Sequence, residues 1–220
     1  MKRSKKSIII GFIMVVFIVG CLTSCSDEDS SGALYNKTYI TGYLMPESVT
    51  TDNSESGIIL TINGNVFTNG DIFNELSKLY NDTSYNRYST LPPRIAIGET
   101  ISKIRIETID YFDISHPSGS DISDLIECQY ISYYDYVQSG YQDEHKNIED
   151  YKDAMEYYHI NGAKLFKEKL VDIDYTNMNL CTPGIILKFN EFPENQGKYQ
   201  FKLVFVTQHN EFETTFSYDF

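Results

Sequence analysis

The sequence predicts a mainly β protein: an antiparallel β-sandwich, Ig-like or transthyretin-like, with one or two short helices. Short segments in which apolar and polar residues alternate recur along the chain, and clusters of turn-forming residues separate them. Branched and aromatic residues, which favour strands, are frequent in these segments. With 41% apolar and 22% charged residues, the composition is that of a globular protein. We therefore expect a single sandwich domain over residues 34–220.

The first part of this domain is predicted to hold strands, a tight turn and a helix. Asn63 and Gly64 predict a hairpin turn, because both central residues of a type I′ turn need a positive φ. Apolar residues then recur at helical spacing behind Asn69 and Asp71, which can cap a helix. The expected elements are strands at 35–45, 58–62 and 65–67, a helix at 71–80, and loops at 50–57 and 81–93.

The middle of the domain mixes strands with a second helix. The alternation of one strand changes phase at Thr108, which indicates a β-bulge or a bend. Asn147 and Asp150 mimic a capping box at the start of the second helix, and Gly162 can end it. The expected elements are strands at 94–97, 101–112 and 127–137, a turn at 115–121, and a helix at 147–160; 163–170 is either further helix or strand.

The end of the chain predicts an antiparallel hairpin. Residues 185–189, 199–206 and 212–220 alternate with a period of two and present one apolar face each. A slip of one residue in the strand pairing would expose a whole row of aromatic side chains to water. The alternation therefore defines the register. The residues expected to point into the core are Phe201, Leu203, Phe205, Phe212 and Phe216.

The first 24 residues form a secretory signal of the lipoprotein type. Four basic residues precede an apolar run at 8–19, which is too short to be a membrane span. The sequences that end at Cys21 and at Cys25 both resemble a bacterial lipobox, in which the cysteine receives the lipid. We favour Cys25, because the acidic, serine-rich stretch 26–32 follows it. Residues 25–33 are then a lipidated, flexible tether.

The lipobox at Cys25, the acidic stretch after it and the closing strands at 184–220 resemble uncharacterised surface lipoproteins of gut Bacteroidota. The segment 116–126, followed by an aromatic strand, is also similar to that group. The resemblance implies a lipid-anchored protein of the outer membrane that is displayed on the cell surface. It implies no catalytic residue.

The net charge and the absence of known catalytic motifs argue against several classes of function. The formal net charge is −13, which argues against a nucleic-acid partner bound in a basic groove. The sequence has no phosphate-binding loop, no Gly-x-Ser-x-Gly elbow and no histidine spacing typical of zinc, so we expect neither cofactor nor metal. Ser118 and Ser120 lie close to His116 and Asp121 in sequence, but residues so near on one turn rarely form a catalytic triad.

These observations favour a non-catalytic binding or structural module of the envelope, with a glycan or a protein as ligand. The alternative is an envelope hydrolase that processes glycans with a pair of carboxylates, because carboxylates are abundant. The chain has 18 tyrosines and no tryptophan, and Tyr80, Tyr85 and Tyr88 form a possible binding surface in a loop. Cys128 and Cys181 are either a disulfide or two buried thiols. The oligomeric state stays open.

Overall fold

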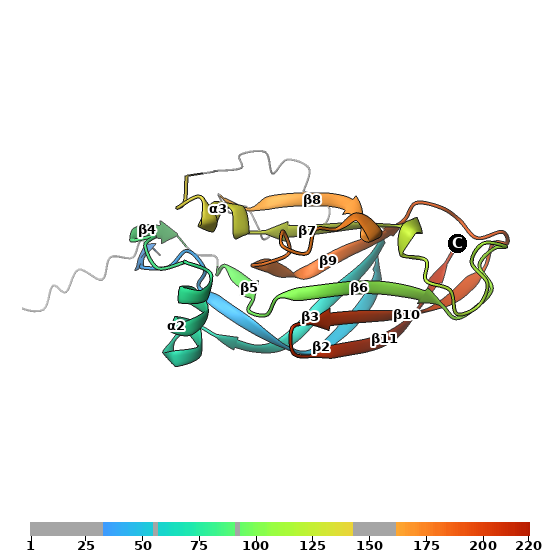
Figure 1. The fold of residues 1–220 in the computed structure, drawn as a ribbon, viewed down its shortest axis with the longest axis horizontal. Helices are drawn as coiled ribbons and strands as arrows, with labels where there is room; N and C mark the ends of the chain where they lie inside the picture. The colour runs from blue at the N-terminus through green and yellow to red at the C-terminus, as the bar shows by residue number, and fades with distance from the viewer. Residues whose placement is uncertain (1–32, 55–56, 91–92, 143–161) are drawn as a thin grey trace, which may run out of the picture.

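The computed structural model describes residues 33–54, 57–90, 93–142 and 162–220, and it shows two packed β-sheets (Figure 1). One sheet has six strands in the order β5-β2-β3-β9-β7-β8, and the other has three in the order β11-β10-β6. The six strands are β2 (Gly42–Ser54), β3 (Gly57–Phe67), β5 (Ile95–Ile97), β7 (Ile126–Ser132), β8 (Lys164–Lys169) and β9 (Cys181–Phe189). The three are β6 (Ile101–Thr108), β10 (Lys198–Thr207) and β11 (Glu211–Asp219). The predicted β-sandwich is confirmed.

Smaller elements complete the fold. A two-stranded ribbon joins β1 (Ala33–Asn36) to β4 (Arg87–Thr90). The described helices are α2 (Gly70–Leu79), α3 (Tyr134–Gln138) and two 3₁₀ turns, η1 (Ser123–Leu125) and η3 (Leu170–Asp172). Strand pairs are antiparallel throughout, except that the short edge strand β5 runs parallel to β2. Over the described residues, no helix is both long and apolar enough to cross a membrane.

The larger core lies between the two sheets, and the C-terminal hairpin supplies much of it. Phe201 lies opposite Phe216 across β10 and β11, and Phe205 lies opposite Phe212. Phe201, Leu203 and Phe205 are fully buried, Phe216 is buried, and Phe212 packs half-buried against the same core. The predicted hairpin and its inward face are confirmed, because the period-two alternation leaves one register that buries the aromatic row.

A second core covers the opposite face of the six-stranded sheet at one end. Neighbouring strand residues point to opposite faces, so Leu44 joins the first core while Tyr43 joins the second. The second core is rich in tyrosine, and α2 and α3 contribute to it. The predicted helix at 71–80 corresponds to α2, although Ile72 and Leu79 on it are exposed.

The predicted turn at Asn63 and Gly64 is wrong, and so is the polar loop at 50–57. Strand β2 continues through 50–54 and β3 continues through Asn63 and Gly64, and their pairing extends to Ser54 opposite Gly57. Gly64 does not have a positive φ; it lies opposite Pro46 beside a β-bulge, where a Cβ atom would overlap the carbonyl oxygen of Met45. The glycine is needed for close backbone approach instead of for a turn.

Other boundaries differ from the sequence prediction, and the alternative left open at 163–170 is decided. Strand β7 ends at Ser132, whose hydroxyl accepts the Tyr134 N–H at 3.0 Å and so starts α3 inside the predicted strand 127–137. Strand β6 ends at Thr108, where the chain bends, so the phase change there is a bend and not a bulge. The segment 163–170 is mostly strand β8, and part of the predicted loop 81–93 is β4. The predicted helix at 147–160 lies outside the described residues.

Candidate functional site

The candidate site is the end of the sandwich formed by two loops, residues 109–122 after β6 and 190–197 after β9. Figure 1 shows both loops at one end of the long axis, beside the C-terminus. The Glu194 N–H donates to the Phe112 carbonyl at 3.1 Å, which joins the two loops. The Phe220 N–H donates to the Gly197 carbonyl at 3.0 Å, which ties the C-terminus to the same place. We call this region the loop end.

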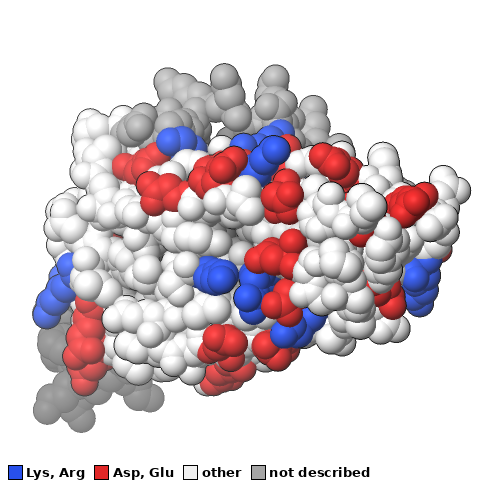
Figure 2. All heavy atoms as spheres, turned by 45° about the vertical axis from the view of Figure 1, so that its right-hand side comes forward, with Lys and Arg blue, Asp and Glu red and all other residues white. Residues whose placement is uncertain are grey.

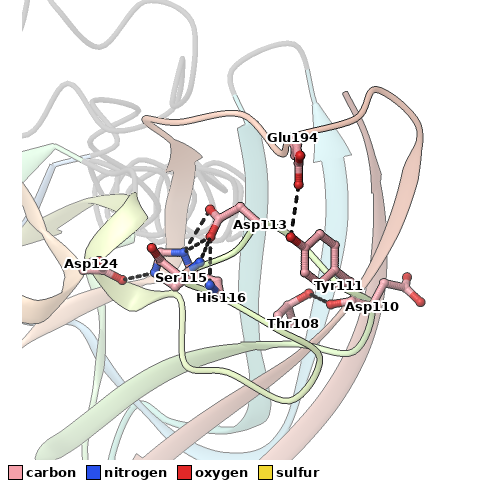
Figure 3. Close-up of polar contacts among 8 residues, drawn as sticks. All are labelled: Thr108, Asp110, Tyr111, Asp113, Ser115, His116, Asp124 and Glu194. Carbon is pink, nitrogen blue, oxygen red and sulfur yellow. Dashed lines mark hydrogen bonds and ion pairs between the residues drawn. The ribbon is translucent and has the colours of Figure 1, made fainter.

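A histidine held by two aspartates organises the first loop (Figure 3). Asp113 Oδ1 accepts the N–H groups of Ser115 at 2.7 Å and of His116 at 2.8 Å, so its carboxylate closes a tight turn. His116 Nδ1 lies 3.0 Å from both oxygens of Asp113, and Nε2 lies 3.6 Å from Asp124 Oδ1. The hydrogen bond to Asp113 raises the pKa of His116 and lowers the pKa of Asp113. The imidazolium form of His116 is therefore more stable here than in a free histidine.

A second polar contact bridges the two loops. Tyr111 Oη donates to Glu194 Oε2 at 3.0 Å, and this bond raises the pKa of Tyr111 (Figure 3). The tyrosine ring is held at the surface, with 48% of the residue exposed. The bond joins residues 83 positions apart in the sequence, so the arrangement depends on the fold.

Apolar side chains are exposed on both loops. Phe192 is 78% exposed and Ile114 is 90% exposed, whereas Ile109 is partly covered at 39%. The ring of Phe192 lies edge-on to Phe220, with 6.3 Å between ring centroids. Large apolar side chains that face water on two adjoining loops are a feature of binding surfaces.

The loop end does not hold a serine–histidine–aspartate arrangement. Ser118 Oγ donates to the Ile109 carbonyl oxygen, and both ring nitrogens of His116 face carboxylates. Nucleophile activation needs a serine on the imidazole instead. What the loop end offers is carboxylate oxygens and apolar surface, which suit binding.

The sequence drew attention to His116 only through a disfavoured catalytic triad, and it did not indicate the two loops as a binding surface. His116 falls in the predicted turn at 115–121, Asp113 and Asp124 lie just outside that turn, and the exposed Ile114 and Phe192 lie between predicted strands. The available signal was the presence of large apolar residues in turn segments, where a solvated loop needs none.

The structure separates the predicted tyrosine surface. Tyr80 is buried in the second core, stacked on Tyr43 with 6.1 Å between centroids. Tyr85 is half-buried, with its ring edge-on to Tyr39 at 5.3 Å. Tyr88 is 76% exposed and pairs with Tyr35 on the β1–β4 ribbon. The three tyrosines therefore do not form one exposed surface.

Around Tyr39 the second core contains a buried carboxylate. Asp82 accepts the N–H of Tyr39 at 2.7 Å and of Ile40 at 2.8 Å, and the hydroxyl of Tyr141 at 2.9 Å. Burial raises the pKa of Asp82, although these three donors and the nearby Arg94 favour its charged form. Its bonds are to the surrounding backbone and core, which indicates a structural role.

Cys128 and Cys181 are both free, buried thiols. On the β7–β9 ladder Cys128 lies opposite Leu187, whereas Cys181 lies opposite Ser132. Positions 128 and 132 are four residues apart on one strand, or roughly 13 Å, and a disulfide needs Cα atoms within about 7 Å. The disulfide alternative is therefore not realised, and burial raises the pKa of Cys181 to about 12.

Comparisons with known proteins add no identification. No protein-family model, no curated protein and no solved structure matches the chain. Within the described residues, no cluster of three or more His, Cys, Asp or Glu could hold a metal ion. The predicted lipidation site, Cys25, lies outside the described residues.

Proposed function

We propose that the protein is a lipid-anchored module of the outer membrane or cell surface, which binds a ligand through its loop end and performs no catalysis. The observation that carries the binding role is the exposure of Ile114, Tyr111 and Phe192 on two loops that are tied together. The anchoring rests on the signal sequence that ends at Cys25.

The arrangement of the fold is consistent with this proposal. The described chain begins in the β1–β4 ribbon, which Figure 1 shows at the end of the long axis opposite to the loop end. A tether attached before β1 would therefore leave the loop end pointing away from the membrane. The hydrolase alternative needs a carboxylate kept protonated beside a second one. Among the described residues, the carboxyl group with a raised pKa is Asp82, which already accepts three hydrogen bonds in the core.

The anchoring is tested by mass spectrometry of the native N-terminus. We expect it to start at a Cys25 that carries a thioether-linked lipid. Cys25→Ser should move the protein from the membrane fraction to the soluble fraction, whereas the matched variant Cys21→Ser should leave it in the membrane. An unmodified N-terminus downstream of Cys25 would contradict the proposal, and loss of anchoring in Cys21→Ser alone would move the site to Cys21.

The binding role is tested separately with a glycan array and with peptide ligands on the purified protein. Ligands should lose affinity when Phe192→Ser and Ile114→Ser are combined. A ligand whose binding is unaffected by this pair, but is lost on changes elsewhere, would place the binding face away from the loop end.

A further inference from the structure

We infer that the ligand of the loop end is a polypeptide segment that is both basic and apolar. This inference rests on the proposed binding role and names the chemical class of the ligand. Three features of the loop end support it: the kind of apolar surface, its rigidity, and the sign of the charge around it.

The apolar surface suits a polypeptide. Phe192 and Ile114 expose apolar atoms that cannot form hydrogen bonds, so they gain free energy only when another apolar group covers them. Tyr111 adds a half-exposed aromatic ring with a polar tip. Aliphatic and aromatic side chains of a peptide would cover all three. The hydroxyl-rich faces of a sugar would not match the aliphatic surface of Ile114.

The surface is held in place before any ligand arrives. The hydrogen bond from Tyr111 to Glu194 fixes the ring across the two loops, and Phe192 packs edge-on to Phe220. The turn that carries Ile114 is closed by Asp113, which accepts two N–H groups and lies beside the His116 ring. Side chains that are already ordered lose less conformational entropy on binding, so exposed groups of this kind contribute more to affinity.

The charged side chains of the two loop segments are mostly acidic. Residues 109–124 and 190–197 contain no lysine or arginine; the nearest basic residue along the chain is the exposed Lys198. Figure 2 brings this end of the molecule forward and shows acidic side chains set in uncharged surface, with some lysine and arginine side chains among them. The acidic residues of the two segments are Asp110, Asp113, Asp121, Asp124, Glu191 and Glu194.

When protonated, His116 offsets part of this charge, because its ring lies between Asp113 and Asp124. Glu191 stays exposed. Complementary charge speeds the association of a partner and excludes partners of like charge. A basic segment is therefore attracted to this surface. A second copy of this chain is not, since it would bring the same carboxylates and the same excess of acidic residues.

The test uses three short, dye-labelled synthetic peptides and the native full chain in a non-ionic detergent, with binding followed by fluorescence anisotropy. One peptide alternates lysine with leucine, one alternates lysine with serine, and one alternates glutamate with leucine. We expect the lysine–leucine peptide to bind most tightly. Combining Phe192→Ser with Ile114→Ser should raise the Kd of this peptide by about tenfold. This is the effect of losing roughly 1.4 kcal/mol of binding free energy.

Helix α2 supplies matched controls far from the loop end. Ile72 and Leu79 are exposed apolar residues on it, at 41% and 70%, so Ile72→Ser with Leu79→Ser should leave the Kd unchanged. For charge, Glu191→Gln should weaken binding and reduce its dependence on salt, whereas Glu75→Gln on α2 should not. Unchanged melting temperatures in all variants show that the fold is intact.

Each contrary outcome has a defined meaning. Equal binding of the lysine–serine peptide would overturn the apolar part of the inference, and binding of the glutamate–leucine peptide would overturn the charge part. An equal loss of affinity in the α2 control variants would show that the peptide is attracted to the acidic chain as a whole and not to the loop end. If a neutral oligosaccharide binds at the loop end and none of the peptides does, the ligand class is wrong while the binding role stands. If no ligand depends on Phe192 or Ile114, the proposed binding role fails as well.

Discussion

His116 is the residue of the loop end whose charge changes near neutral pH. Its folded pKa is raised above the ordinary value of 6.5 by the bond to Asp113, so its contribution to stability is fully present below pH 6.5. That contribution is lost as the pH rises through the folded pKa. The pKa of Asp113 is lowered from 3.8, so its contribution is present above pH 3.8 and is lost as the pH falls through the lowered value. The pair of Asp113 and His116 therefore stabilises the loop end most between pH 3.8 and pH 6.5.

We predict that His116→Gln removes part of the pH dependence of unfolding. Between about pH 5.5 and pH 8.5 the native protein should lose up to a few degrees in Tm through this residue, because a partly exposed ion pair contributes at most about 1 kcal/mol. Thermal melts of both proteins across this range measure the difference. The same pH dependence in native protein and variant would show that His116 does not titrate against Asp113.

Asp82 acts at the same scale in the second core. Replacing it with alanine removes the acceptor for the N–H groups of Tyr39 and Ile40, and each buried donor that loses its partner costs about 1–3 kcal/mol. We predict that Asp82→Ala lowers the free energy of unfolding by about 2–5 kcal/mol and that Asp82→Asn, which keeps one acceptor oxygen, costs less. Urea denaturation measures both values. The exposed Asp71→Asn is the control, and an equal effect of all three changes would refute the structural role of Asp82.

At the scale of elements, the C-terminal hairpin shows how one alternation separates core from surface. Phe201 is fully buried, whereas its neighbour Lys202 lies on the outer face and pairs with Glu107 at 2.8 Å and with Glu213 at 3.4 Å. Acidic and basic side chains also lie side by side across the face shown in Figure 2. Partly exposed ion pairs of this kind contribute little, and burial of the phenyl rings contributes much.

We therefore predict that Phe201→Ala and Phe216→Ala each lower the free energy of unfolding by about 3–5 kcal/mol. Because the total for a domain is roughly 5–15 kcal/mol, each change should sharply lower the yield of folded protein. Lys202→Ala and Glu213→Ala should each leave the free energy of unfolding nearly unchanged, because exposed ion pairs are screened by solvent. Thermal melts of the four variants decide this. Equal costs for the aromatic and charged changes would mean that the faces are assigned wrongly.

Elements with strong periodicity could be predicted from the sequence, and elements decided by tertiary contacts could not. Strands β10 and β11 and helix α2 each bury one face, so their spacing was sufficient. Gly64 was misread because its signal for a turn is the same as its signal for close backbone approach, and only the opposite strand at Met45 distinguishes them. The loop end could not be predicted, since Tyr111 and Glu194 meet only after the sheets have packed.

At the scale of the whole molecule, the six-stranded sheet is shared by both cores. Tyr130 and Ile131 are consecutive residues of β7, yet the first belongs to the core between the sheets and the second to the tyrosine-rich core. Loss of either core would expose one face of the same strands and remove the support of the other. The two cores are thus expected to unfold together, although they lie on opposite faces of the sheet.

We predict a single unfolding transition that substitutions in either core shift. Ile131→Ala in the tyrosine-rich core and Leu203→Ala between the sheets should each cost about 2–5 kcal/mol and lower the same Tm by roughly 4–20 °C. Val171→Ala, at a residue 55% exposed, should move it little. Near-ultraviolet circular dichroism reports chiefly on the tyrosines of the second core, and far-ultraviolet dichroism reports on the sheets, so the two melting curves should coincide in every variant. If Ile131→Ala melts the tyrosine signal first and leaves the sheet signal unchanged, the second core is an independent unit, and the sheet does not couple the two.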